Sequence, residues 1–243
     1  MDSRKESQGL LALTLVFGFL AFAWHTAEPF AGALADGTPA GLFLSILVLA
    51  CLGLARLDSP RRQSPVWDAL FFGWSAWVVG EGVALSMALG ASGLPVWAPG
   101  ALKLVFYPLA FYALLRAKQF YNVGATMAAK WNAFGLTAGA VALSLYGLYG
   151  QITGLDLARH AFDIVLIGAS LYAFFWSKET EEEEKPFKWI GLGFACLASY
   201  GLFVLVTTAL GVYEELFYAV DALFYASFAF LALGAEKQVK LGA

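Results

Sequence analysis

The chain has 243 residues, of which 60% are hydrophobic and only 14% are charged. Soluble globular proteins carry about 25% charged residues, so the composition excludes that class and indicates an integral membrane protein in a lipid bilayer, with the cell membrane as its expected location. The formal net charge of −3 provides no cationic surface, so nucleic acid is not an expected partner.

Long apolar segments follow one another along the whole chain. A spanning helix needs about 20 predominantly apolar residues. Eight segments meet this requirement: Leu10–Phe30, Ala40–Arg56, Trp67–Gly90, Val96–Arg116, Trp131–Gly150, Leu155–Trp176, Trp189–Leu210 and Val212–Leu233. The sequence therefore predicts an all-α, polytopic membrane helix bundle with eight transmembrane helices, in one integral membrane domain covering residues 1–243.

The first of these segments follows Arg4 and Lys5 and has features of a secretory signal peptide. His25 and Glu28 interrupt the approach to the small residues at 31–33, where cleavage would occur. We therefore expect the segment to be retained as a transmembrane helix.

Lysine and arginine residues gather in alternate loops. All but two of the 15 such residues fall on the side that holds the N-terminus, and the exceptions are Lys103 and Arg159. Cytoplasmic loops are enriched in positive residues. The pattern therefore predicts eight spans with both termini in the cytoplasm.

The spans divide into four helical hairpins of one orientation. The predicted repeats cover residues 9–57, 66–118, 130–178 and 188–237. In the last three, a charged residue enters the second helix, and these residues, about 60 positions apart, are Lys103, Asp163 and Asp221. Chance similarity between apolar helices is the alternative explanation.

Two further features concern helix packing. Small residues recur at every fourth position in two spans: Gly135 and Gly139 in one, and Gly191, Ala195 and Ser199 in the other. This spacing lets helix backbones approach closely, either within the chain or across a dimer. Pro108 lacks a backbone donor inside a span, which predicts a kink.

Ionisable residues inside the spans are the candidate functional positions. Placing Asp, Lys or Arg at mid-membrane costs about 2.5–3.5 kcal/mol, so such residues usually face protein or water. Here they fall in the outer half of the spans, which predicts a polar pocket for a small ligand, a lipid or a proton. With two tyrosines from the repeated stretches, this pocket comprises Glu81, Lys103, Asp163, Asp221, Arg159, His25, Tyr107 and Tyr225.

Partners for these charges follow from depth and spacing. Lys103 is expected to pair with Asp163 or Asp221. Arg159 competes for Asp163 because it lies one turn earlier on the same helix face. Glu81 has no evident partner in the sequence, which makes it a candidate for proton uptake. A purely structural polar network is the alternative.

No motif predicts an enzyme, a metal site or a cofactor. Cys51 and Cys196 lack the spacing of a disulfide framework or a zinc site. Glu214 and Glu215 are similar to the glutamate pair of intramembrane proteases, but the accompanying arginine and histidine motifs are missing. The last span has no lysine before Lys237 for a retinal Schiff base.

One pattern has a counterpart in a known kind of domain, and it consists of Trp67, Gly80-Glu81-Gly82, Leu102-Lys103 and Phe106-Tyr107-Pro108-Leu109. It resembles the multi-helix membrane sensor domains that precede signalling outputs in bacteria and archaea. Those domains use repeated hairpins with an acidic residue entering the second helix of each pair. The resemblance implies this role for Asp163 and Asp221, whereas Lys103 departs from it.

We therefore expect a non-enzymatic, sensor-like membrane protein that passes a helix shift to a membrane or cytoplasmic protein partner. A transporter or proton-conducting protein that uses the intramembrane carboxylates is the first alternative, although the inner half of the spans lacks polar groups for a continuous path. A structural subunit of a membrane complex is the second alternative.

Overall fold

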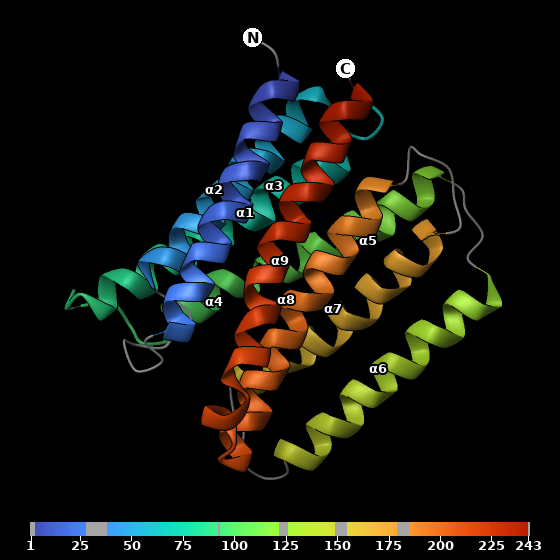
Figure 1. The fold of residues 1–243 in the computed structure, drawn as a ribbon. Coiled ribbons are helices and arrows are strands. Elements are labelled where there is room, and N and C mark those ends of the chain that lie inside the picture. The colour runs from blue at the N-terminus through green and yellow to red at the C-terminus, as the bar shows by residue number, and fades with distance from the viewer. Residues whose placement is uncertain are drawn as a thin grey trace.

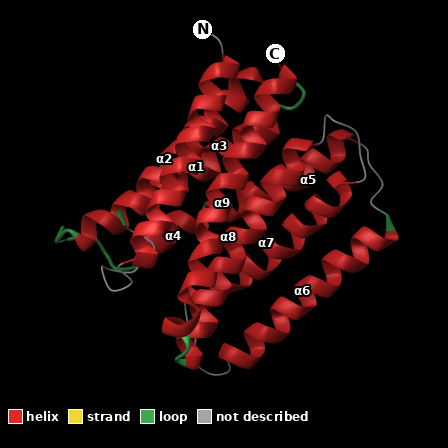
Figure 2. Ribbon diagram, viewed as in Figure 1, coloured by secondary structure: helices red, strands yellow, loops and turns green. Residues whose placement is uncertain are grey.

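The computed structural model describes residues 3–27, 38–91, 93–121, 126–148, 155–178 and 185–242. Within these residues the chain forms helices joined by turns and short loops (Figure 1, Figure 2). The helices are α1 (Ser3–Ala27), α2 (Pro39–Asp58), α3 (Ser64–Ala88), α4 (Ala98–Leu104), α5 (Phe106–Tyr121), α6 (Met127–Leu148), α7 (Leu155–Lys178), α8 (Lys185–Leu210) and α9 (Tyr213–Gly242). The predicted all-α class is confirmed.

Both ends of the described chain lie at the same end of the bundle (Figure 1). Arg4 Nη2 donates a hydrogen bond to the Lys240 carbonyl oxygen at 3.2 Å. The turn between α2 and α3 lies there too, because Gln238 Nε2 donates to Gln63 Oε1 at 3.0 Å. We call this the terminal end of the bundle, and the opposite one the distal end. The side of the membrane on which the termini lie stays a prediction.

Seven helices of the described residues are long and apolar enough to cross a membrane. The helices α4 and α5 together supply one of these spans, Ala98–Lys118. The predicted span Trp131–Gly150 corresponds to α6, and its last two residues lie outside the described part. A multi-pass helical membrane protein is thus supported by length and composition. The eighth crossing and the division into four hairpins stay predictions.

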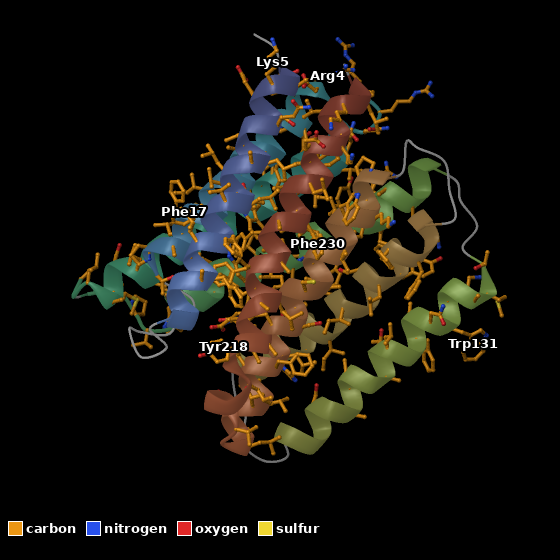
Figure 3. The ribbon with its side chains drawn as sticks, in the orientation of Figure 1. Arg4, Lys5, Phe17, Trp131, Tyr218 and Phe230 are labelled. Carbon is orange, nitrogen blue, oxygen red and sulfur yellow. The ribbon has the colours of Figure 1, made fainter. Side chains whose placement is uncertain are left out.

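Large apolar side chains cover the outside of the bundle. Trp131 is 63% exposed and points away from the other helices in Figure 3. Phe19 and Val96 are also largely exposed. Exposed apolar surface of this extent marks a contact with membrane or protein. Arg4 and Lys5, in contrast, lie at the terminal end in the same view.

A break at Val105 separates α4 from α5, and Pro108 explains it. Pro108 has no N–H to donate to the carbonyl of Leu104, and its ring clashes with that carbonyl. The first helix accordingly ends at Leu104 and the second begins at Phe106. The helix is thus interrupted near Pro108, as expected, and the break divides one span into a short distal helix and a longer one.

The core is aromatic and joins α3 and α5 to α8 and α9. Trp74 and Trp77 stack with their rings 5.8 Å apart, and Phe106 meets both rings edge-on. Phe106 also lies 5.2 Å from Phe194 of α8, and Trp74 lies 5.9 Å from Phe228 of α9. Such rings bury large apolar areas and prefer edge-to-face contacts, so these contacts fix the position of α3 and α5.

The small residues pack as predicted in α8 but not in α6. A Cβ on Gly191 would stand 2.8 Å from the Ser170 carbonyl oxygen, so α7 and α8 approach closely there. A Cβ on Gly135 or Gly139 would meet nothing within 4 Å. Of the two possibilities left open, packing within the described chain is therefore wrong for these two glycines, and contact across a dimer stays a prediction. Thr137 does contact α7, beside Gly168. Its position two residues from each of the two α6 glycines, at 100° per residue, places it on the opposite face of α6.

Candidate functional site

Four of the predicted charged residues lie in the interior of the distal half of the bundle. Glu81, Lys103, Asp163 and Asp221 are all buried. Asp163 and Asp221 each lie about 12 Å along the axis from the first residue of their helix, at 1.5 Å per residue. Each carboxylate therefore lies equally far along its own helix, and their common depth in the membrane stays a prediction.

Lys103 of α4 and Glu81 of α3 form an ion pair inside the bundle. Lys103 Nζ lies 2.9 Å from Glu81 Oε1, and the two side chains are 2% and 0% exposed. The ammonium group also lies 5.0 Å from the centre of the Trp77 ring, a distance at which the ring attracts a cation. The expectation that Glu81 lacks a partner is wrong. The sequence favoured Asp163 or Asp221 as partner of Lys103 because it does not show how α3 packs on α4.

Gly80 permits the approach of α4 to α3. A Cβ at position 80 would stand 2.8 Å from Lys103 Cγ and 3.1 Å from the Pro99 carbonyl oxygen. These distances leave no room for a side chain, so glycine is needed for close packing and not for an unusual backbone angle. The residue next to Glu81 thus sets the distance across which the ion pair forms.

Tyr107 of α5 and Asp163 of α7 make the second polar contact. Tyr107 Oη donates a hydrogen bond to Asp163 Oδ1 at 2.5 Å, and Arg159 interacts with the same hydroxyl. The Tyr107 ring stacks on Phe162 with 5.5 Å between ring centres. A Cβ on Gly201 of α8 would stand 2.8 Å from Asp163 Oδ2. The carboxylate is therefore held between α5 and α8, with Arg159 beside the contact.

The two contacts meet on one stretch of chain. Lys103 and Tyr107 lie four residues apart, on either side of the break at Val105. The first reaches α3 and the second reaches α7, while Phe106 between them packs into the aromatic core. We call these two contacts the polar network.

Tyr225 belongs to a different environment. Its ring on α9 lies 5.6 Å from the ring of Phe22 on α1, beside a cavity lined by residues of α1 and α9. Asp221, one turn earlier, interacts electrostatically with Tyr225. His25 falls in α1, and its side chain lies outside the described residues. Tyr225 therefore lies beside this cavity, and one pocket lined by all eight residues stays a prediction.

Comparison of the chain with protein-family models, curated proteins and solved structures gives no match. No group of three or more His, Cys, Asp or Glu residues in the described part of the chain is placed to hold a metal ion.

Among the described residues, one buried acidic side chain and one buried histidine fall outside the predicted set. Glu236 is buried in the terminal half of α9, where its Oε1 lies 2.5 Å from Lys240 Nζ. If the terminal half is the inner half, the expectation that it lacks polar groups is wrong. The four-residue spacing of Glu236 and Lys240 could have predicted this ion pair from the sequence. His160, next to Arg159 on α7, is also buried, and neither ring nitrogen has a hydrogen-bond partner among the described residues.

Proposed function

We propose that this chain is a non-enzymatic, sensor-like membrane protein that responds to a small ligand, a lipid or a proton at the polar network. The observation that carries the proposal is the ion pair of Glu81 and Lys103, buried inside helices of spanning length. We further propose that the termini are cytoplasmic and that the distal half faces outward. Arg4, Arg61 and Lys240 at the terminal end support this orientation.

A buried ion pair is a poor device for stability alone. Desolvation costs several kcal/mol per ion, and replacing such a pair by packed apolar residues is often neutral or stabilising. The surroundings of this pair are aromatic, with Trp77 in contact with Lys103 and Phe106 in contact with Trp77. Apolar side chains would suit such surroundings. Two charges at this place therefore favour a role in which one of them is neutralised or changes its partner, as in charge-driven switches.

The short helix α4 is the element that such a change would move. Protonation of Glu81, or an anion bound to Lys103, would weaken the attraction that holds α4 on α3. Because the helix is broken at Val105, α4 can shift without an equal shift of α5. The hydrogen bond from Tyr107 to α7 then decides whether the movement continues along α5 toward the terminal end, where Lys118 lies.

A fluorescence titration tests this role. Lys103 lies over the Trp77 ring, so loss of the ion pair would change the surroundings of that tryptophan. We expect protein in phosphatidylcholine nanodiscs to show a pH-dependent step in tryptophan fluorescence that is absent in Glu81→Gln. Trp131→Phe, an exposed site on α6, is the matched control and should retain the step.

One outcome would contradict the proposal, and a second would exclude one stimulus. A step of equal size in Glu81→Gln would show that the ion pair is not the responding group. Absence of a step in the unchanged protein would exclude the proton as the stimulus. The titration would then be repeated at constant pH with candidate anions, for which Lys103→Met is the variant that must lose the response.

A transporter or proton-conducting protein is the second candidate, and Glu236 is the observation that favours it. Asp221 is buried in the distal half of α9 and Glu236 in its terminal half. Proteoliposomes that contain a pH-sensitive dye distinguish the two functions. Proton flux that is abolished by Glu81→Gln or Glu236→Gln would favour conduction, whereas flux equal to that of empty liposomes would exclude it. Stable co-purification of a partner protein without step or flux would favour a structural subunit.

A further inference from the structure

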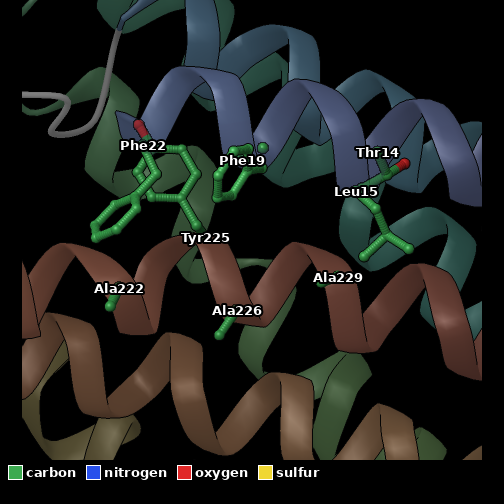
Figure 4. Close-up of a pocket in the computed structure, with 9 residues that line it drawn as sticks. Thr14, Leu15, Phe19, Phe22, Ala222, Tyr225, Ala226 and Ala229 are labelled. Atoms are coloured by element: carbon green, nitrogen blue, oxygen red, sulfur yellow. The ribbon is translucent and has the colours of Figure 1, made fainter. Parts of the chain in front are cut away.

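Cations from three segments of the chain gather at the terminal end of the bundle. The helices α1 and α9 lie side by side (Figure 4), and Arg4 donates to the Lys240 carbonyl oxygen. The turn between α2 and α3 joins them through the contact of Gln238 with Gln63. Residues 3–6, 56–68 and 236–242 hold seven cations and four acids, namely Arg4, Lys5, Arg56, Arg61, Arg62, Lys237 and Lys240 against Glu6, Asp58, Asp68 and Glu236. This end is therefore basic, although the whole chain has a net charge of −3.

Arg56 is held in a fixed position on the outside of this end. Its Nε donates to Asp68 Oδ1, and Ser64 Oγ donates to the other oxygen of that carboxylate at 3.0 Å. The guanidinium carbon lies 5.2 Å from the centre of the Phe71 ring and 5.0 Å from that of Phe72. The side chain is 37% exposed, and its two terminal nitrogens make no hydrogen bond with the described residues. These free N–H groups form a planar fork that fits a phosphate group.

Arg61 and Arg62 follow in the turn between α2 and α3 and have no partners of their own. Both side chains are exposed, and neither forms an ion pair within the described part of the chain. The turn itself is ordered, because the amides of Gln63 and Ser64 both donate to the Pro60 carbonyl oxygen, at 2.8 and 3.1 Å. Two unpaired cations on an ordered turn produce a positive field that attracts an anion.

The turn connects two helices of spanning length, which sets its level in the membrane. The span Ser64–Ala88 has 25 residues and is about 37 Å long, at 1.5 Å per residue. It exceeds a hydrocarbon core of about 30 Å, so its first residues reach the level of the lipid phosphates. Phe72 is 52% exposed on the same helix, one turn deeper than Asp68. One lipid can therefore place its phosphate against Arg56 and an acyl chain against Phe72.

We propose that this part of the terminal end binds an anionic phospholipid, whose phosphate accepts hydrogen bonds from Arg56 in the field of Arg61 and Arg62. A zwitterionic lipid carries a positive amine beside its phosphate, which these arginines repel, whereas phosphatidylglycerol carries none. Clusters of basic residues at the ends of membrane helices are typical sites for anionic lipids. A soluble acidic protein would meet the same cations but not the Phe72 ring, which is exposed within a span. The geometry therefore favours a lipid as the partner.

Native mass spectrometry of the full chain measures this binding. The protein in detergent is mixed with equal amounts of phosphatidylglycerol and phosphatidylcholine, and the ratio of the two bound lipids is determined. We expect an excess of phosphatidylglycerol, and a ratio about fivefold lower in Arg61→Gln or Arg62→Gln, the factor for one basic residue at an anionic membrane surface. Arg56→Gln should lower the ratio at least as much, because it also removes hydrogen bonds to the phosphate. The matched control is Lys130→Gln, which removes the single cation of α6, also exposed, and should leave the ratio unchanged.

Equal retention of the two lipids by the unchanged protein would overturn the preference for an anionic headgroup. An equal loss in Lys130→Gln and Arg61→Gln would show a response to overall charge and refute a site at the turn. Displacement of phosphatidylglycerol by an equal concentration of glycerol phosphate would identify a soluble phosphate as the ligand and overturn the lipid. Because Arg61 and Arg62 are exposed and unpaired, we expect their variants to fold, which the unfolding midpoint in phosphatidylcholine nanodiscs checks. None of these residues belongs to the polar network, so the result is independent of the ion pair of Glu81 and Lys103.

Discussion

Glu81→Gln removes the negative charge that lies 2.9 Å from the Lys103 ammonium group. Truncating one partner of a buried ion pair costs about 3–5 kcal/mol, because the remaining buried charge loses an opposite charge in direct contact. Lys103→Met should cost a similar amount for the same reason. The double variant removes both charges, and we expect it to be more stable than either single variant, with a coupling energy of up to about 3 kcal/mol.

The measurement is the free energy of unfolding in mixed micelles, followed by circular dichroism for the four members of the cycle. The matched control is the pair of Arg56 and Asp68, whose side chains are 37% and 35% exposed. For Asp68→Asn we expect a loss of about 1 kcal/mol or less, as for other exposed pairs. The reasoning fails if Glu81→Gln costs no more than Asp68→Asn, or if the double variant is as unstable as the sum of the single variants.

Three further predictions concern packing, the second polar contact and topology. Gly80→Ala should destabilise the protein by about 1–3 kcal/mol in thermal unfolding, because its Cβ would stand 2.8 Å from a Lys103 side-chain carbon; Gly82→Ala, with nothing within 4 Å, should not. Tyr107→Phe should lower the free energy of unfolding by about 1.5–3 kcal/mol in denaturant unfolding, because it removes the hydrogen bond to the Asp163 carboxylate. An equal loss for the same change at Tyr112, an exposed tyrosine of α5, would contradict this. A cysteine at Arg61 should react in intact cells only with membrane-permeant thiol reagents, and labelling by an impermeant reagent would reverse the proposed orientation.

The sequence predicts the helices well because lipid leaves the chain few alternatives. A segment in the hydrocarbon region must satisfy its backbone hydrogen bonds internally, so apolar length translates directly into helices. The effect of Pro108 is equally local, since the break follows from its missing N–H and its ring. The burial of Asp163 and Asp221 could also be predicted from the sequence. A charge exposed to lipid is so unfavourable that it faces the protein interior whatever its neighbours are.

The pairing of Glu81 with Lys103 could not be predicted from the sequence, because it depends on how two helices are rotated about their axes. Gly80 brings α4 onto α3, and hydropathy contains no information on that contact. Glu236 was missed because the last span was expected to end at Leu233, whereas α9 continues to Gly242. A charge that appears to lie beyond a helix is thus still inside the bundle. Small-residue spacing has the same limit, because it defines a helix face but not the neighbour that occupies it.

The two polar contacts lie on helices that differ in length and packing. This difference determines which helix a change at the polar network would displace first. Lys103 lies on α4, a helix of only 7 residues, whose packing on α3 includes the ion pair and the close approach at Gly80. Tyr107 lies on α5, a helix of 16 residues that is also fixed by the contacts of Phe106 with α3 and α8. A stimulus at Glu81 would therefore displace α4 before α5. Transmission to the terminal end then requires the Tyr107 contact to change as well, so the network would respond in two steps rather than one.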